Sequence, residues 1–377
     1  MTKSVTLPPA TLGIIGGGQL GRMMAEAAKP LGYRVVVVDP QPDAPAGQVA
    51  DQQLVAAYDD RAALAQLAQQ CDVLTYEFEN VDAETLAEVS TPAQLPQGVE
   101  ILNITSDRLL EKQFIEWQGI PVTDFQAVDH LDDLAAAVAK LGTPAILKTR
   151  HGGYDGHGQW NVPNPAAVEQ LLQTVDPKVG PFLLEKQLMF SEEVSMMVTR
   201  AADGQITTWP LAHNVHQDHI LKVTQVNADD DPRLTEAAEA AAAKIAAGLQ
   251  LRGVLGVEMF VVDHQIVVNE LAPRPHNSGH YTIEGCNISQ FEGHVRSIMG
   301  LPIEKPRLIE PEATMINLLG DQLTQAQQSL PDYPEWHFHD YQKDQIKPHR
   351  KMAHITVLGH ANQQRLLEWE QTHHENN

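Results

Sequence analysis

Hydrophobic and polar positions over residues 11–78 predict strands and helices in alternation. The apolar runs "TLGII" and "RVVVVD" are typical of buried strands, and "QLGRMMAEAAKPLGY" between them has helical spacing. A helix follows over 61–70, "RAALAQLAQQ", and then a strand over 71–78, "CDVLTYEF". Strands that alternate with helices form parallel sheets with helices on their faces. We therefore expect an α/β domain over residues 1–108.

Beyond residue 108 the pattern mixes helices with pairs of strands, which favours an α+β arrangement. The alanine-rich segment 231–250 predicts a long helix that Asp231 caps and Pro232 begins. The other expected elements are helices over 107–120 and 291–300 and strands over 144–150, 181–188, 192–200 and on either side of Asp263–His264. We expect one domain over residues 109–309 and a smaller one over 310–377, with a polar, frayed end.

Composition narrows the class of protein. A chain of 377 residues with 43% hydrophobic and 20% charged residues is typical of a soluble protein of two or three domains. The formal charge of −23 argues against a nucleic-acid partner, although a small anionic substrate needs only a local basic pocket. The sequence has no apolar run long enough for a membrane helix and no signal-peptide pattern at its start. Since Cys71 and Cys286 are the only cysteines, we expect a reducing, cytoplasmic environment.

The first glycine-rich turn matches a dinucleotide fingerprint. Gly16, Gly18 and Gly21 satisfy G-x-G-x-x-G, and Asp39 closes the next strand at the expected distance. One hypothesis is a nicotinamide-dependent dehydrogenase. The alternative is that the backbone amides and the helix N-terminus serve another anion, while Asp39 only stabilises the turn.

Two glutamates are expected to meet across a hairpin. If residues 256–271, "GVEMFVVDHQIVVNEL", fold back around His264, Glu258 lies opposite Glu270 with the two Cβ atoms about 5 Å apart. Two carboxylates so close repel each other unless a divalent cation lies between them, and oxygen ligands suit Mg²⁺. The alternative is a pair of solvated glutamates on an exposed face.

A second glycine-rich segment lies between two lysines that follow apolar strands. Lys148 ends "AILK" and Lys186 follows "FLLE", and lysines at strand ends can hold phosphate oxygens. The segment 151–159, "HGGYDGHGQ", has four glycines and can turn backbone N–H groups toward a phosphate chain. The alternative interpretation is a solvated turn.

These residues together resemble an ATP-grasp ligase, and within that group the 5-(carboxyamino)imidazole ribonucleotide synthases of purine biosynthesis. The resemblance runs from about Leu12 to about Ile355, over nearly the whole chain. Its specific motifs are "GGGQLGRM", "YEFENV", "GGYDGHGQ", "HNVHQD" and "NELAPRPHNSGH". It implies an ATP-grasp fold with a lid over about 109–190, a Rossmann-like pre-ATP-grasp domain before it and a small C-terminal domain that binds the substrate phosphate.

The resemblance also implies a nucleotide site. Glu193 would bind the ribose, adenine would lie against residues 185–188, and Glu258 and Glu270, aided by Asn269, would hold Mg²⁺. The residues implied for ATP are Arg108, Lys148, Gly153, Tyr154, Asp155, Gly156, His157, Gly158, Gln159, Glu185, Lys186, Gln187, Leu188, Glu193, His216, Asn269 and Glu270.

For the second substrate the resemblance implies contacts from several segments. The implied substrate residues are Gln19, Leu20, Glu77, Asn277, Ser278, Lys343, Arg350 and Lys351. Arg274 would hold bicarbonate and the carboxyphosphate anion, and His276, Tyr154 and Asp155 would orient the substrate or move its proton. Near Glu77, we expect Glu79 or Asn80 only to cap the following helix.

The basic cluster in "YQKDQIKPHRKMAH" (341–354) departs from the family pattern, which is roughly R-P-G-R-K-M-G-H. Lys347 replaces an arginine, and His349 and Ala353 replace glycines. Lysine is a poorer bidentate partner than arginine, and histidine lacks the backbone freedom of glycine. The alternative interpretation is a solvated charged face.

The implied reaction uses ATP to phosphorylate bicarbonate, because hydroxide is a poor leaving group and phosphate is a good one. Carboxyphosphate, or CO₂ released from it, then carboxylates the amine of 5-aminoimidazole ribonucleotide. The implied partners are these small molecules and, by family, a second copy of the chain in a homodimer.

Other hypotheses stay open. The related ATP- and formate-dependent glycinamide ribonucleotide formyltransferase shares the first glycine turn, and a non-catalytic ATP-grasp-like protein is a further alternative. We expect Cys286 to be a buried thiol, and only His216 of "HQDH" (216–219) to contact a nucleotide.

Overall fold

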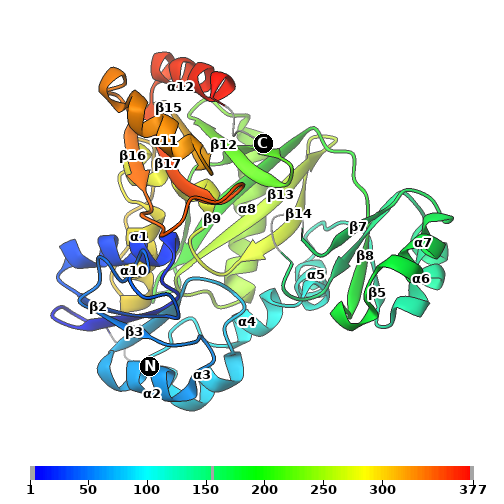
Figure 1. Ribbon diagram of the computed structural model, residues 1–377, viewed down its shortest axis with the longest axis horizontal. Helices are drawn as coiled ribbons and strands as arrows, with labels where there is room; N and C mark the ends of the chain where they lie inside the picture. The colour runs from blue at the N-terminus through cyan, green and yellow to red at the C-terminus, as the bar shows by residue number, and fades with distance from the viewer. Residues whose placement is uncertain (1–4, 154–156, 374–377) are drawn as a thin grey trace.

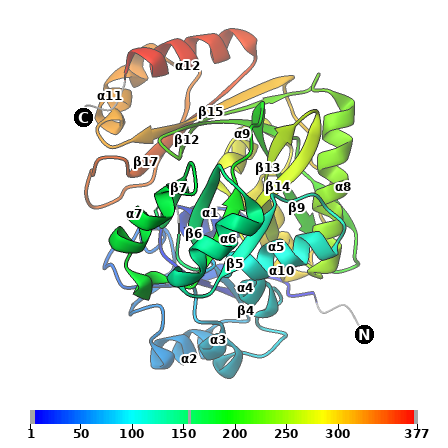
Figure 2. The same ribbon diagram turned by 90° about the vertical axis from the view of Figure 1, so that its right-hand side faces the viewer.

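The computed structural model describes residues 5–153 and 157–373, and its strands form three sheets. Figure 1 shows a main body with a smaller lobe projecting from one side, and in Figure 2 this lobe faces the viewer in front of the body. Within the described ranges, no helix is both long enough and apolar enough to cross a membrane.

The first sheet is parallel, as the alternating pattern predicts. Its order is β3-β2-β1-β4, and β1 and β2 are almost wholly buried because helices cover both faces. Asp60 and Asp82 cap the second and third helices through their carboxylates. The elements are β1 (Thr11–Ile15), α1 (Gln19–Ala28), η1 (Lys29–Leu31), β2 (Arg34–Asp39), β3 (Gln52–Val55), α2 (Arg61–Gln70), β4 (Val73–Tyr76), α3 (Ala83–Val89) and α4 (Glu100–Thr105).

The projecting lobe is an antiparallel sheet with helices on one side. Helix α5 (Arg108–Trp117), which Asp107 caps, leads into it. The strand order is β5-β8-β6-β7, and the lobe has its own apolar core. Its elements are β5 (Phe125–Val128), η2 (Leu131–Asp133), α6 (Leu134–Leu141), β6 (Ala145–Thr149), β7 (Gln159–Val162), α7 (Ala167–Thr174), η3 (Pro177–Val179) and β8 (Phe182–Lys186).

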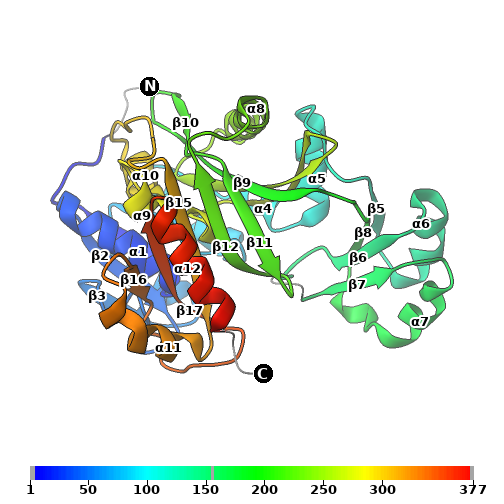
Figure 3. The same cartoon turned by 90° about the horizontal axis from the view of Figure 1, so that it is seen from above.

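A large antiparallel sheet forms the centre of the molecule. Its order is β14-β13-β9-β11-β12-β15-β17-β16, with β10 beside β9, so the strands that follow residue 310 extend this sheet. Figure 3 shows it passing between the lobe and the C-terminal helices. The strands are β9 (Glu192–Arg200), β10 (Ile206–Thr208), β11 (Ala212–Gln217), β12 (Ile220–Asn227), β13 (Val254–Val262), β14 (Gln265–Ala272), β15 (Glu312–Leu319), β16 (His337–Asp340) and β17 (Lys351–Leu358).

Helices cover the central sheet. The predicted alanine-rich helix is α8 (Pro232–Gly248), and the carboxylate of Asp231 accepts a hydrogen bond from the Arg233 amide at its start. Helix α10 (Gln290–Met299) ends at Gly300, whose φ of 76° is left-handed, and it packs against α1 of the first sheet. The remaining elements are η4 (Asn277–Gly279), α9 (Thr282–Gly285), α11 (Gln322–Ser329), η5 (Leu330–Asp332) and α12 (His360–Thr372).

The hairpin between β13 and β14 corrects one sequence prediction and confirms another. Asp263 and His264 form a two-residue turn with φ of 49° and 63°, so Val262 pairs with Gln265 and the register near the turn differs from the prediction. A bulge then shifts the pairing at Asn269, which is the extra residue of β14. Beyond it Glu258 lies opposite Glu270, as predicted.

Candidate active site

A cavity of about 1010 Å³ lies where the three sheets meet. The first sheet contributes the glycine turn and the end of β4, the lobe contributes β6 to β8, and the central sheet contributes β11, β13 and β14. The sequence-predicted residues that line it are Gln19, Leu20, Glu77, Arg108, Lys148, Gly153, Gln159, Glu185, Lys186, Gln187, Leu188, Glu193, His216, Glu258, Asn269, Glu270, Arg274, His276, Asn277, Lys343, Arg350 and Lys351.

The amides of the first glycine turn are occupied by the chain's own carboxylates. Gly17 donates to Asp39 at 2.7 Å, while Gly18 and Leu20 donate to Glu77 at 2.5 and 2.9 Å. Burial raises the pKa of Glu77, and these backbone hydrogen bonds oppose that rise. Asp39 also accepts from the Gln41 amide and the Tyr58 hydroxyl, so it stabilises the turn as expected. The turn therefore offers no free amide cradle of the kind that a dinucleotide pyrophosphate needs.

The loop after β4 corrects the expectation that Glu79 or Asn80 caps the next helix. Asp82 caps α3 instead, because its carboxylate accepts from the amides of Glu84 and Thr85. Glu79 turns to the cavity and accepts from Arg274 Nε at 3.1 Å. Burial alone would raise the pKa of Glu79, but the charge and hydrogen bond of Arg274, together with a backbone hydrogen bond, outweigh it and the pKa is lowered.

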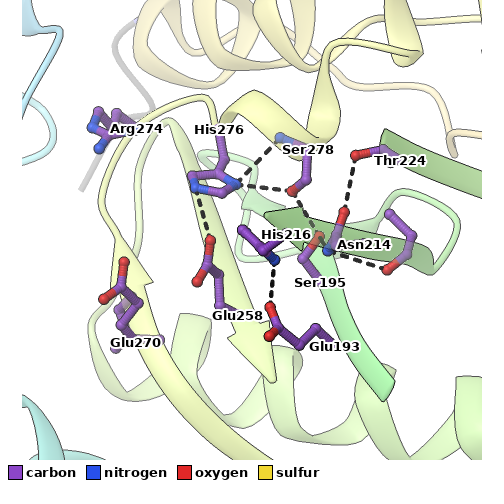
Figure 4. A network of polar contacts seen from close by, with 12 residues as sticks. Glu193, Ser195, Asn214, His216, Thr224, Glu258, Glu270, Arg274, His276 and Ser278 are labelled. Atoms are coloured by element: carbon purple, nitrogen blue, oxygen red, sulfur yellow. Dashed lines mark hydrogen bonds and ion pairs between the residues drawn. The ribbon is translucent and has the colours of Figure 1, made fainter. Parts of the chain in front are cut away.

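The two hairpin carboxylates line the same cavity, and each lies beside a nitrogen-bearing side chain of the protein. Figure 4 shows Glu258 and Glu270 side by side on adjacent strands. Glu258 Oε1 lies 3.1 Å from His276 Nε2, and Glu270 Oε2 lies 3.2 Å from an Arg108 nitrogen. Burial would raise the pKa of Glu258, but the hydrogen bond from His276 and the positive charge around the site, including that of Lys351, lower it to about 2. Glu258 is therefore ionised at neutral pH.

A buried ionic cluster underlies the glutamate pair. Lys148 Nζ donates to Glu185 at 2.9 Å, and Lys112 Nζ lies 3.7 Å from the same carboxylate while donating to the Asn269 carbonyl at 2.8 Å. Burial would raise the pKa of Glu185, but the charges of Lys112 and Lys148 lower it to about 2. Lys148 thus lines the cavity with its ammonium group already positioned, while Lys112 stays buried behind it.

Sequence reasoning did not single out Lys112 or its neighbour Glu111, both of which are buried. Glu111 accepts from the Leu271 amide at 3.0 Å, and burial together with the charge of Glu270 raises its pKa to about 8. Their spacing could have indicated a role, because both lie one turn after Arg108 on α5 and share its face. In the structure this face of α5 packs toward β14.

Two described residues of the second glycine segment (151–159) lie at the cavity. Gly153 and Gln159 line the cavity, and Arg108 donates to the Gly153 carbonyl at 3.1 Å. Gly152 and Gly158 have φ of 72° and 73°, which explains the need for glycine there. His157 and Gly158 are described but do not line the cavity. The remaining predicted residues of this segment, Tyr154, Asp155 and Gly156, lie outside the described residues.

The side of the cavity next to the lobe combines apolar and polar side chains. Phe190 stacks on Phe260 with ring centroids 4.5 Å apart, beside the segment 185–188. Glu193 on β9 is paired with His216 Nδ1 on β11. Burial alone would lower the pKa of His216, but Glu193 outweighs it and the pKa is raised. Lys186 donates to the Thr143 carbonyl at 3.1 Å.

The segment after β14 carries the residues predicted for bicarbonate and substrate. Asn277 lines the cavity, and both atoms of its side-chain amide lack a hydrogen-bond partner among the described residues. The position of Ser278 differs from the one expected of a residue that binds substrate. It is 1% exposed and absent from the cavity lining, and its hydroxyl contacts His276 and Ser195. Its hydroxyl is therefore already hydrogen-bonded to other residues of the protein.

The C-terminal basic cluster reaches the same cavity. Lys343, Arg350 and Lys351 line it, Lys343 donates to the Lys351 carbonyl at 2.6 Å, and Arg350 lies 3.1 Å from Asp344. His349, which stands where the family pattern has glycine, adopts a φ of 60°. The left-handed backbone is thus kept without glycine.

Comparisons with known proteins agree with this geometry. Three family models match: "Ribonucleotide synthetase preATP-grasp domain" over residues 9–105, "ATP-grasp domain" over 113–291 and "Phosphoribosylaminoimidazole carboxylase C-terminal domain" over 313–367. The chain is 45% identical to the N5-carboxyaminoimidazole ribonucleotide synthase of Bacillus subtilis (strain 168), over 95% of this chain and 94% of that one. It is 43% identical to the enzyme of the same name from Staphylococcus aureus (strain COL), over 93% and 92%.

Solved structures give the same result. A crystal structure of an ADP complex of N5-carboxyaminoimidazole ribonucleotide synthetase has a TM-score of 0.92 at 41% identity and covers 98% of this chain and 99% of that chain. The Aspergillus clavatus enzyme in complex with ADP and 5-aminoimidazole ribonucleotide has a TM-score of 0.87 at 31% identity, over 95% and 98%. The chain therefore belongs to the N5-carboxyaminoimidazole ribonucleotide synthase family of ATP-grasp ligases.

Proposed function

We propose that this protein carboxylates 5-aminoimidazole ribonucleotide with bicarbonate at the expense of ATP, releasing ADP and phosphate. The observation that carries the proposal is the single cavity. It brings together Lys148, the carboxylates Glu258 and Glu270, and a separate basic group, Lys343, Arg350 and Lys351. One polyanion can occupy each basic region, which suits a nucleoside triphosphate and a ribonucleotide phosphate.

The nucleotide binds at the lobe side of the cavity. Adenine lies against residues 185–188 and the Phe190–Phe260 stack, and the free Oε1 of Glu185 and the Glu193 carboxylate are acceptors for amino and hydroxyl groups. Arg108, Lys148, Lys186 and His216 face the phosphate chain and offset its charge. The lobe over about 109–190 serves as the lid, and Gly153 and Gln159 of its second glycine segment line the cavity.

The hairpin residues fit a magnesium ion. Glu258 and Glu270 supply hard oxygen ligands from opposed positions, the Asn269 side chain lines the same wall, and Glu258 is ionised at neutral pH. Among the described residues no group of three His, Cys, Asp or Glu side chains could hold a metal by itself. This agrees with magnesium sites that use one or two carboxylates with substrate phosphates and water. Bound Mg²⁺ would neutralise charge on the transferring phosphoryl group.

Bicarbonate binds between the nucleotide and the ribonucleotide, beside Arg274 and His276. A bicarbonate oxygen attacks the γ-phosphorus of ATP, the bond to the bridging oxygen breaks, and ADP leaves with that electron pair. The guanidinium of Arg274 holds the carboxyphosphate anion. The exocyclic amine then bonds to the carboxyl carbon, phosphate leaves and the amine loses a proton. Water must be excluded because carboxyphosphate hydrolyses readily, and a closed lid does so.

The ribonucleotide lies on the opposite side of the cavity. Lys343, Arg350 and Lys351 hold its phosphate, and Gln19, Leu20 and Asn277 line the space for the ribose and imidazole. Glu77 holds the glycine turn in place through its backbone contacts rather than serving as a free ligand.

The direct test is the stoichiometry of turnover. ADP release should depend jointly on bicarbonate and 5-aminoimidazole ribonucleotide, with one N-carboxylated product for each ADP. Turnover with formate in place of bicarbonate would overturn the proposal in favour of a formyltransferase, which the comparisons do not favour. ATP binding without turnover would instead indicate a binding protein.

We also propose a cytoplasmic homodimer. Both cysteines are free and buried, which suits a reducing compartment, and the dimer follows from the family resemblance. Sedimentation at micromolar concentration would test the dimer.

A further inference from the structure

A buried row of hydrogen bonds leads away from His276 into the central sheet. Figure 4 shows it running from Glu258 through His276, Ser278, Ser195 and Asn214. Ser278 Oγ lies 2.8 Å from His276 Nδ1 and 2.6 Å from Ser195 Oγ. Ser195 and Ser278 are 0% and 1% exposed, so water does not compete for these contacts.

The direction of donation is fixed at the far end of this row. Asn214 Nδ2 lies 2.9 Å from Ser195 Oγ and 3.5 Å from the Ala212 carbonyl, while Oδ1 accepts from the Thr224 hydroxyl at 2.9 Å. The reversed amide would place Oδ1 against the Ala212 carbonyl, which is repulsive. Asn214 therefore donates to Ser195. Among the described residues, Ser278 Oγ is the acceptor that the hydrogen bonds offer to the buried Ser195 hydroxyl, and His276 Nδ1 is then the acceptor left for Ser278, so we assign donation from Ser195 to Ser278 and from Ser278 to His276.

Two further contacts require the same proton position on His276. The Ser278 backbone amide also points at Nδ1, at 3.4 Å, and an amide can only donate. On the other side of the ring, Nε2 lies 3.1 Å from the Glu258 carboxylate, whose oxygen accepts a hydrogen bond. Nδ1 is thus the acceptor and Nε2 carries the proton.

The backbone of His276 is held as firmly as its ring. The buried Gln290 side chain accepts from the His276 amide at 2.8 Å and donates to its carbonyl at 2.7 Å. Gly256 on β13 leaves the space for the ring, because a Cβ there would lie 2.7 Å from His276 Cβ. Little freedom remains except rotation of the hydroxyl protons.

We propose that Ser195, Ser278 and Asn214 are positioning residues that hold His276 with its proton on Nε2, so that this N–H faces the cavity. The inference rests on the proposed function, in which Glu258 also binds Mg²⁺. A carboxylate drawn toward a cation is a weaker acceptor, and the hydroxyl row then maintains the proton position alone. His276 can donate this hydrogen bond to the bicarbonate or carboxyphosphate anion beside Arg274.

The test is nitrogen-15 spectroscopy of the histidine rings in the metal-free protein, with His276→Gln used to assign the signals. We expect a protonated Nε2 and a bare Nδ1 in the unmodified chain. In Ser195→Ala the Ser278 hydroxyl has lost its donor and can accept instead, so a form protonated on Nδ1 should appear. Ser297→Ala, which removes a buried hydroxyl outside this row, should leave the spectrum unchanged.

Kinetics provide the second readout. Ser195→Ala should lower kcat about tenfold with little change in KM for ATP, and Ser195→Thr should restore most of the loss. Should Ser195→Ala misfold, Thr224→Val removes the hydroxyl at the far end with little change of shape and should shift the same signals. A proton on Nδ1 in the unmodified chain, or a spectrum unaltered by Ser195→Ala, overturns the proposal. If the unmodified chain lacked carboxylation, the proposed function would fail while the spectrum still decided the proton position.

Discussion

The side chains of this site are positioned by contacts between residues that lie far apart in the sequence. Glu77 accepts hydrogen bonds from glycine-turn residues 57–59 positions earlier in the sequence. Arg274 donates a hydrogen bond to Glu79 across a separation of 195 residues. The motifs that resemble the ATP-grasp family implied that Glu77, Arg274 and His276 belong near the site. They could not predict Lys112 or Ser195, because a lysine in a helix and a serine in a strand acquire their partners only when the sheets pack.

Gly16→Ala should destabilise the first sheet. Gly16 has a φ of 108°, and a Cβ there would lie 2.6 Å from Glu77 Cβ. We expect a loss of about 2–4 kcal/mol in the free energy of unfolding, from backbone strain and overpacking together. Gly119→Ala is the matched control, because its φ is also positive but a Cβ would meet no atom within 4 Å. Equal losses in denaturant titrations of the two variants would contradict the close contact.

Arg274→Ala should separate nucleotide binding from chemistry. The guanidinium lines the cavity beside Glu79, and its loss should reduce carboxylation at least about a hundredfold while the Kd for ATP changes little. Arg296→Ala, which also breaks an ion pair with a glutamate, serves as the control. Steady-state rates and equilibrium nucleotide binding measure the two effects. Near-normal turnover of Arg274→Ala would remove this residue from the mechanism.

At the level of elements, the hairpin determines where the two proposed metal ligands lie. Alternation of residues predicted that Glu258 faces Glu270, and it does, but the predicted register was wrong near the turn. Two positive φ angles at Asp263 and His264 make the turn one residue tighter, and the bulge at Asn269 restores the pairing. Bulges depend on neighbouring strands and loops, so a single-strand pattern cannot reveal them. Glu258 still pairs with Glu270 because the tighter turn and the bulge at Asn269 shift the register by one residue in opposite directions.

Glu258→Gln and Glu270→Gln should each weaken the magnesium dependence of turnover. Replacing a carboxylate by an amide removes a charge from the proposed ligand pair, and we expect the Mg²⁺ concentration for half-maximal rate to rise at least about tenfold. Glu192→Gln is the control, because this residue of β9 pairs with His213 of β11 and does not line the cavity. Unchanged magnesium titrations for both hairpin variants would eliminate the site.

At the scale of the whole molecule, the first sheet and the central sheet share an apolar core and are also joined by buried polar contacts. His294 on α10 is an example, since its Nε2 lies 2.8 Å from Thr75 on β4 and its Nδ1 accepts from the Val254 amide on β13. Such contacts join elements that sequence patterns treat separately. The pattern predicted the parallel sheet and the hairpin, but it did not predict that strands after residue 310 extend the central sheet.

Acidic pH should therefore lower the free energy of unfolding of the protein. Burial lowers the pKa of His294 to about 3, and burial also lowers the pKa of His280 and His354. An unfolded histidine has a pKa of about 6.5, so the unfolded chain binds more protons below that pH. Stability is fully present above pH ~6.5 and falls by about 1.4 kcal/mol per pH unit for each such histidine as the pH drops.

His294→Gln tests this contribution. The variant cannot be protonated, so its stability should fall less steeply between about pH 6 and 4.5, by up to about 1.4 kcal/mol per unit. Exposed His337, changed to Gln, is the control. Denaturant titrations at several pH values compare the slopes, and equal slopes for His294→Gln and the unmodified chain would refute the assignment.

The central claim is that ATP activates bicarbonate within this cavity. The most direct measurement follows oxygen-18 from freshly mixed labelled bicarbonate into inorganic phosphate during turnover with 5-aminoimidazole ribonucleotide. If a bicarbonate oxygen attacks the γ-phosphorus, each phosphate released should carry one labelled oxygen. Phosphate without label, at a rate of ADP release equal to that of carboxylation, would contradict the account.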